Sequence, residues 1–177
     1  MSIHDPLQLY DFVREVPDFP KPGILYRDIT PLLADAQAFQ AAIQFLAKRL
    51  ERHRVDEILA IESRGFIFGA ALALHLKRPL HLVRKAGKLP RTTFAEQYSL
   101  EYGTDSLELH TDAIKPGTRY AIIDDVIATG GTAAAVCRLT AKCGGIVACC
   151  AFLLELRGLD GRLKLNACPV ESLLSCD

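Results

Sequence analysis

The stretch of sequence most informative about the fold runs from Tyr120 to Thr132 and reads YAIIDDVIATGGT. Its first four residues are apolar, as in a buried strand, and two acids, Asp124 and Asp125, end that strand. A short loop of small residues follows, and then a helix begins. This order predicts one unit of an open α/β sheet, in which ligands bind at the carboxyl ends of the strands.

The loop of this unit is suited to a phosphate group. Its residues are small or hydroxylated: Ala128, Thr129, Gly130, Gly131 and Thr132. The glycines let the backbone approach a ligand, and the start of the helix offers free N–H groups and the positive end of its dipole. Because Asp124 and Asp125 would repel a phosphate, we expect them to face sugar hydroxyls or a metal ion. The alternative is an ordinary turn with two solvated acids. A Walker A loop is excluded, since no GK[ST] follows the glycines.

Strands and helices alternate along the rest of the chain. Apolar runs predict strands at 58–61, 80–83, 107–109, 120–123, 146–154 and 171–174, and helical spacing predicts helices at 39–50, 65–77 and 131–143. The fold class predicted by this alternation is α/β, an open, mostly parallel sheet with helices on both faces. The length of 177 residues suits a single domain covering 1–177.

Two segments lack a regular period. Residues 1–34 hold Pro17, Pro20, Pro22 and Gly23, and they predict an extended arm or irregular cap. Residues 85–103 are polar and predict a long, flexible loop; loops of this length within a domain tend to be functional or mobile.

The composition is that of an ordinary globular protein. The chain has 21 Lys and Arg residues against 21 Asp and Glu residues, so its net charge is zero, which argues against a nucleic-acid partner. It lacks the roughly 20 consecutive apolar residues of a membrane span. The first residues do not have the pattern of a signal peptide, so we expect a cytoplasmic protein.

The six cysteines form no CxxC pair. We therefore expect them to be reduced and mostly buried as small hydrophobic side chains, and disulfides or zinc ligation are the weaker alternatives.

Four segments together resemble a known family. They are FPKPGILYRDITP at 19–31, ESRGFIFG at 62–69, RKAGKLP at 84–90 continuing to YSLEYG at 98–103, and the stretch 120–132. In this order and spacing they are similar to the adenine phosphoribosyltransferases, of the type I phosphoribosyltransferase family, over about residues 19–162. The resemblance implies transfer of the 5-phosphoribosyl group of phosphoribosyl pyrophosphate (PRPP) to adenine, giving AMP and pyrophosphate. It also implies an N-terminal hood over the base, a homodimer, and Mg²⁺ held mainly through PRPP, with no protein metal ligands.

The resemblance also assigns residues to PRPP. Asp124 and Asp125 would bind the ribose hydroxyls, and residues 128–132 the 5-phosphate. Ser63 and Arg64 would hold the diphosphate, after an unusual peptide at Glu62–Ser63. Two further diphosphate ligands are implied, Lys88 and Tyr102. Without the resemblance, the cations Arg84, Lys85, Lys88 and Arg91 would be interpreted as a solvated charged face.

Other residues are assigned to the base. Backbone groups of Leu25 and Arg27 would bind the adenine edge, and Leu156 would pack on the ring. Glu101 and Arg64 would be the catalytic residues, with Glu101 as the acid/base group. Closure of a loop would desolvate Glu101 and raise its pKa. The alternatives are a surface glutamate for Glu101 and a core leucine for Leu156.

Three other functions stay open from the sequence. The chain could act on hypoxanthine, guanine, xanthine or orotate, or it could be a PRPP-sensing regulator on the same fold. The least specific alternative is an α/β nucleotide-binding domain. The chain departs from the family pattern at Val126–Ile127, where leucines are usual, and after Arg162, where the match is weak.

Overall fold

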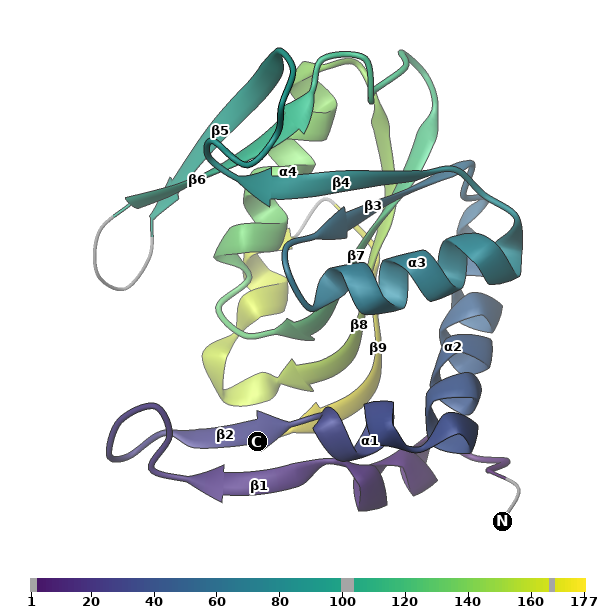
Figure 1. Ribbon diagram of the computed structural model, residues 1–177, viewed down its shortest axis with the longest axis vertical. Helices are drawn as coiled ribbons and strands as arrows, with labels where there is room; N and C mark the ends of the chain where they lie inside the picture. The colour runs from purple at the N-terminus through teal and green to yellow at the C-terminus, as the bar shows by residue number, and fades with distance from the viewer. Residues whose placement is uncertain (1–2, 100–103, 166–167) are drawn as a thin grey trace.

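A seven-stranded sheet forms the centre of the protein in a computed structural model that describes residues 3–99, 104–165 and 168–177 (Figure 1). The strand order is β5-β6-β4-β3-β7-β8-β9. Five strands are parallel: β3 (Glu57–Ile61), β4 (Leu80–Lys85), β7 (Arg119–Ile127), β8 (Ile146–Leu156) and β9 (Val170–Cys176). Strands β5 (Thr93–Ser99) and β6 (Thr104–His110) form an antiparallel hairpin at one edge. The predicted α/β class and the mostly parallel sheet are confirmed.

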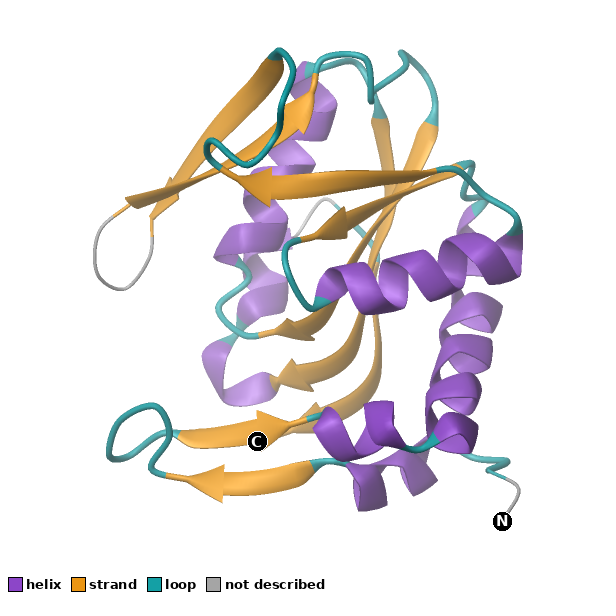
Figure 2. Cartoon of the chain, viewed as in Figure 1, coloured by secondary structure: helices purple, strands orange, loops and turns teal. Residues whose placement is uncertain are grey.

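Helices cover both faces of the sheet (Figure 2). The helices α1 (Thr30–Ala34), α2 (Ala36–Leu50) and α3 (Gly65–Leu76) lie on one face, and α4 (Gly131–Lys142) lies on the other. Short 3₁₀ helices occur at Pro6–Phe12, Glu51–His53, Arg157–Leu159 and Gly161–Leu165. Within the described ranges, no helix has the length and apolar character needed to cross a membrane.

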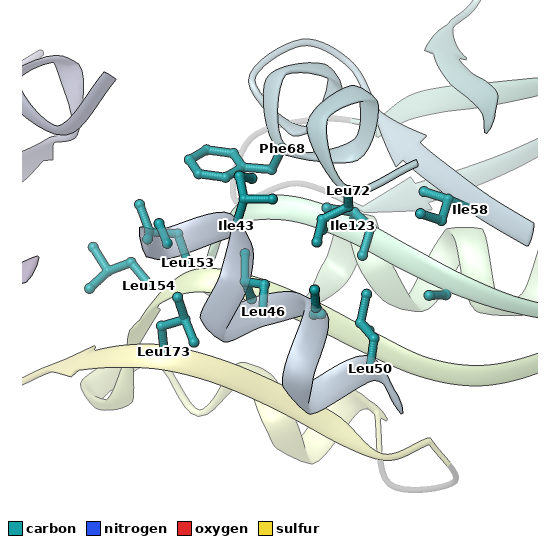
Figure 3. Close-up of a cluster of buried hydrophobic side chains, with 14 of the residues drawn as sticks. Ile43, Leu46, Leu50, Ile58, Phe68, Leu72, Ile123, Leu153, Leu154 and Leu173 are labelled. Atoms are coloured by element: carbon teal, nitrogen blue, oxygen red, sulfur yellow. The ribbon is translucent and has the colours of Figure 1, made fainter. Parts of the chain in front are cut away.

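Alternation along the central strand divides the hydrophobic core in two. In β7, Ala121 and Ile123 face α2 and α3, whereas Tyr120 and Ile122 face α4, and all four are fully buried. Figure 3 shows the first of these clusters, in which Leu46 of α2 lies among side chains from several elements. Side chains buried on both faces are typical of a parallel sheet.

The prediction that 85–103 is a loop was wrong for residues 93–99, which form β5. Residues along β5 alternate as a strand should, but one of its inward positions is the carboxylate Glu96. Glu96 is buried because Arg138 of α4 donates to it at 2.7 Å and Lys142 pairs with it as well. An apolar pattern cannot detect a strand whose inward side chain is charged.

The N-terminal arm is more regular than predicted. β1 (Arg14–Pro17) pairs with β2 (Leu25–Asp28), so the prolines lie in and around a hairpin. The arm is anchored by Tyr10, whose hydroxyl donates to the carbonyl oxygen of Ser175 at 2.5 Å and accepts from the Ser175 N–H at 2.8 Å.

Candidate active site

The two acids predicted at the end of the central strand lie within it. Strand β7 continues to Ile127 because β8 pairs with it as far as Ile127–Glu155, whereas the pairing with β3 ends at Ile123. Asp124 and Asp125 therefore lie on the part of β7 that extends beyond β3. The position of the acids at the carboxyl side of the sheet is as expected, but the strand ends four residues later than predicted, at Ile127.

The acid pair is electrostatically unfavourable on its own. Burial, and then the neighbouring Asp125 carboxylate, raise the pKa of Asp124 well above its ordinary value. The Nε of Arg64 lies 2.8 Å from Oδ2 of Asp125, but that buried oxygen has no hydrogen bond to any of the described residues. A donor from a ligand would complete the hydrogen bonding of this ion-paired oxygen.

The segment Glu62–Arg64 connects β3 to α3 at the same side of the sheet. The peptide bond between Glu62 and Ser63 is cis, which is the unusual peptide expected there. Arg64 is fixed by a residue of the hood that the sequence did not single out. The Tyr26 hydroxyl accepts from Arg64, whose guanidinium carbon lies 5.7 Å from the centroid of the Tyr26 ring.

The predicted phosphate loop packs tightly against a distant part of the chain. Gly130 has φ 74°, a conformation that favours glycine. A Cβ atom on Gly130 would overlap the carbonyl oxygen of Gly161, and a Cβ atom on Gly161 would overlap that of Ala128. The loop lines a small cavity of about 90 Å³ that includes Thr129, Gly130 and Gly131. Gly161 was not predicted as a site residue, since no local pattern marks it.

The segment that carries Gly161 is held by an ion pair between the exposed Arg162 and the buried Glu155. Arg162 donates two hydrogen bonds to Glu155, of 2.6 and 2.7 Å, and a third of 2.8 Å to the carbonyl oxygen of Val170. The two hydrogen bonds from Arg162 lower the pKa of Glu155, although burial acts to raise it. The phosphate loop is thus supported from β8 and β9.

The four clustered cations have different environments. Arg84 binds Glu62, with Nε 3.2 Å from Oε2, while Lys85 pairs with Asp105 and Arg91 with Asp112. Arg84 also donates to the carbonyl oxygen of Lys88 at 2.9 Å. Burial acts to raise the pKa of Glu62. Hydrogen bonds from the Arg84 side chain and from the backbone N–H of Lys85 outweigh this effect and lower the pKa. Among the described residues, Lys88 alone of the four cations has no ion pair.

One cavity of about 730 Å³ brings most of the candidate residues together. It is lined by the expected residues Leu25, Arg27, Ser63, Arg64, Lys88, Asp124, Asp125, Ala128, Thr132 and Leu156. Its wall also includes residues that were not predicted as ligands, namely Ile24, Tyr26, Glu62, Lys85, Tyr98, Leu107 and Val126. Two predicted residues, Glu101 and Tyr102, lie outside the described ranges.

The hood residues reach this cavity from the N-terminal hairpin. Leu25 is 43% exposed, so it contributes an apolar surface to the cavity rather than to the core. The side chain of Arg27 pairs with Glu15. Leu156, the last residue of β8, also lines the cavity.

Comparisons with known proteins show which family the chain resembles over most of its length. Residues 32–174 match the family described as "Phosphoribosyl transferase domain". Adenine phosphoribosyltransferase of Rubrobacter xylanophilus is 54% identical over 155 residues, which cover 88% of this chain and 84% of the relative.

Solved structures are similar as well. The crystal structure of adenine phosphoribosyltransferase from Thermoanaerobacter pseudethanolicus has a TM-score of 0.94 at 50% identity, covering 97% of this chain and 99% of that one. The Saccharomyces cerevisiae enzyme, solved with adenine and an imino-altritol bisphosphate, has a TM-score of 0.91 at 40% identity, covering 95% and 97%. The matches extend over nearly the whole chain, hood and sheet included, and this chain belongs to the adenine phosphoribosyltransferase family of phosphoribosyl transferase domains.

Proposed function

We propose that this protein transfers the 5-phosphoribosyl group of PRPP to adenine, giving AMP and pyrophosphate, as a step of purine salvage. The observation that carries the proposal is the 730 Å³ cavity, in which the acid pair, the two ends of the predicted phosphate loop, Arg64, Lys88 and the apolar hood meet. Each part suits one chemical group of the two substrates. The yeast relative, crystallised with adenine, supports the choice of base.

The charged and polar groups of the cavity suggest where each part of PRPP would bind. The 5-phosphate would lie on the N–H groups of residues 128–132 at the start of α4. The ribose hydroxyls would donate to Asp124 and Asp125, which would satisfy the buried Oδ2 of Asp125. The diphosphate would lie against Ser63, Arg64 and Lys88, and we place Tyr102 beside it.

Magnesium fits this site through its oxygen donors. The carboxylates of Asp124 and Asp125 and the phosphates of PRPP are the ligands that Mg²⁺ prefers. We propose that PRPP would hold the ion mainly through its own phosphates, and the bound ion would supply positive charge beside the diphosphate. Arg64 supplies a fixed positive charge for the same purpose, and Tyr26 and Asp125 hold its guanidinium in place before substrate binds.

Adenine would enter between the hood and the end of β8. Its ring would pack on Leu156 and Leu25, and backbone groups at Leu25 and Arg27 would bind its edge, because a 6-amino group needs an acceptor such as a carbonyl oxygen. N9 of adenine would then bond to the anomeric carbon as the bond to pyrophosphate breaks, with inversion. Holding both reactants in line contributes several kcal/mol.

Water has to be excluded, or PRPP would be hydrolysed. We propose that residues 85–103 close over the site, while β5 within this range stays anchored to α4 through Glu96. Closure would carry Glu101 to the base, where desolvation raises its pKa and lets it exchange a proton near neutrality.

Replacement of Glu101 by Leu is expected to lower kcat by about 100-fold or more, as is usual when a general acid/base is lost. The affinity for PRPP should stay nearly unchanged, because Glu101 is placed on the base side. Steady-state kinetics and calorimetry with PRPP measure the two effects separately. A kcat within about threefold of the parent, less than 1 kcal/mol of barrier, would remove Glu101 from the mechanism.

A substrate panel tests the proposal as a whole. Pyrophosphate release from PRPP and Mg²⁺ is measured with adenine, hypoxanthine, guanine and orotate in parallel. Release with adenine alone, together with AMP, is the expected result. Release with another base would keep the PRPP site and overturn the assignment of the hood, whereas PRPP binding without release would favour the regulator.

We further propose that the protein is a cytoplasmic homodimer. The family resemblance supports both statements, and the balanced charge supports the absence of nucleic-acid partners. Light scattering of the purified protein at several concentrations tests the dimer, and a single monomeric mass at all of them would contradict it.

A further inference from the structure

Three cysteine side chains from separate parts of the chain meet beside α4. Cys137 lies on α4, Cys150 lies on β8, and Cys168 lies just before β9. The Sγ atom of Cys150 is 3.5 Å from that of Cys137 and 3.7 Å from that of Cys168, and all three sulfur atoms lie within 4.8 Å of one another. Cys150 is 13 residues from Cys137 and 18 residues from Cys168 in the sequence, so no short cysteine motif predicts this cluster.

The sulfur separations match those of a metal-thiolate site. Zinc binds cysteine at about 2.3 Å with tetrahedral geometry, which places neighbouring sulfur atoms roughly 3.8 Å apart. The cluster would need little movement to close around such an ion. A disulfide, by contrast, requires a separation of about 2.05 Å and an oxidant to accept two electrons.

The surroundings allow an ion to enter and to be held. Cys150 is fully buried in the core cluster that faces α4, while Cys137 and Cys168 are only partly buried at its margin. Thiolates select soft cations. Three thiolates leave one net negative charge around a divalent ion and two around a monovalent one, so burial favours the divalent ion.

We propose that Cys137, Cys150 and Cys168 form a binding site for one soft divalent d¹⁰ cation, Zn²⁺ or its analogue Cd²⁺. The ion is held by three thiolates, with water at the fourth position, as in zinc sites that have three protein ligands. Each bound thiol releases its proton to solvent, and no atom changes oxidation state. Binding therefore weakens as the pH falls. The site lies apart from the described walls of the substrate cavity.

The test uses the full chain, reduced with a phosphine under nitrogen and titrated with Cd²⁺. The expected result is a sulfur-to-cadmium charge-transfer absorption that saturates at one ion per chain, with the same stoichiometry in the native mass spectrum. Cys168→Ser should weaken binding by more than about 100-fold, since loss of an outer-shell partner alone costs 10–100-fold. This variant changes a partly buried side chain, so it tests the site even if Cys150→Ala does not fold.

Cys149→Ala is the matched control. Cys149 is the neighbour of Cys150 on β8, but it is buried in the other core cluster, facing α2 and α3. Its replacement should leave Cd²⁺ binding unchanged. The proposal is overturned if Cys168→Ser and Cys149→Ala bind Cd²⁺ as the parent does, if both lose it equally, or if the parent gives no charge-transfer absorption.

Discussion

Replacement of both Asp124 and Asp125 by Asn is expected to weaken PRPP binding by at least about 100-fold. Hydrogen bonds to charged groups contribute about 1.5–3 kcal/mol each, and two of them would be weakened together. Asparagine keeps the shape of the side chain but offers one acceptor oxygen in place of two. Isothermal calorimetry with PRPP and Mg²⁺ measures the change directly.

The single variant Asp124→Asn should also be more stable than the parent at neutral pH. Burial and the Asp125 charge raise the pKa of Asp124 above its ordinary value of 3.8 in the folded protein. Between these two pKa values the folded chain binds more protons than the unfolded chain, so the free energy of unfolding falls as the pH rises. Asparagine cannot ionise and avoids this loss. Thermal unfolding should therefore show a rise in Tm that is larger at pH 7 than at pH 4.

Asp11→Asn is the control for both measurements, because Asp11 is an exposed residue outside the cavity. It should change neither the PRPP affinity nor the pH dependence of Tm. An unchanged PRPP affinity in the double variant would contradict the assignment of the ribose hydroxyls to these acids. A Tm gain equal at both pH values would contradict the electrostatic explanation.

Gly130→Ala is expected to lower kcat/KM for PRPP by about 100-fold, the loss that a displacement of roughly 1 Å causes in an active site. The new methyl group would overlap Gly161, and φ 74° is unfavourable for alanine. Overlap and backbone strain each cost about 1–3 kcal/mol of stability. Gly161→Ala introduces the overlap without a positive φ, so its effects should be in the same direction and smaller.

Gly158→Ala separates this packing from a general effect of alanine. Gly158 lies in the same segment as Gly161, but a Cβ atom there would meet nothing within 4 Å. Its kcat/KM and Tm should equal those of the parent. If Gly161→Ala behaves like Gly158→Ala in both, the segment at 157–165 does not support the phosphate loop.

Local patterns in the sequence predicted the parts of the fold that are held by local interactions. The stretch 120–132 has an apolar run, small residues and a helical period, and the structure has a strand, a loop and a helix there. The length of β7 depended on its neighbour β8, which no local pattern reports. Local sequence patterns therefore could not predict that Asp124 lies within a strand.

Polar groups paired across long distances account for most of what was missed. Glu96 looked like a solvated loop residue because its partner Arg138 lies 42 positions away. Glu155 is satisfied by Arg162, at the end of the region that resembles the family, and by Ser172, which lies beyond it where the family pattern is weak. Tyr26 was hidden for a different reason, since an aromatic residue in a proline-rich arm has several equally plausible partners.

The pairing of Glu96 with Arg138 and Lys142 has a consequence for protein engineering. It joins the hairpin that leads to Glu101 to the helix that starts at the phosphate loop. A chimaera that receives this hairpin from a relative with another base preference would place an unmatched side chain against two cations, or leave a buried carboxylate alone. Grafts that exchange β5, β6 and α4 together should therefore fold better than grafts of the hairpin alone. Base preference would then be transferred only when all three elements are exchanged together.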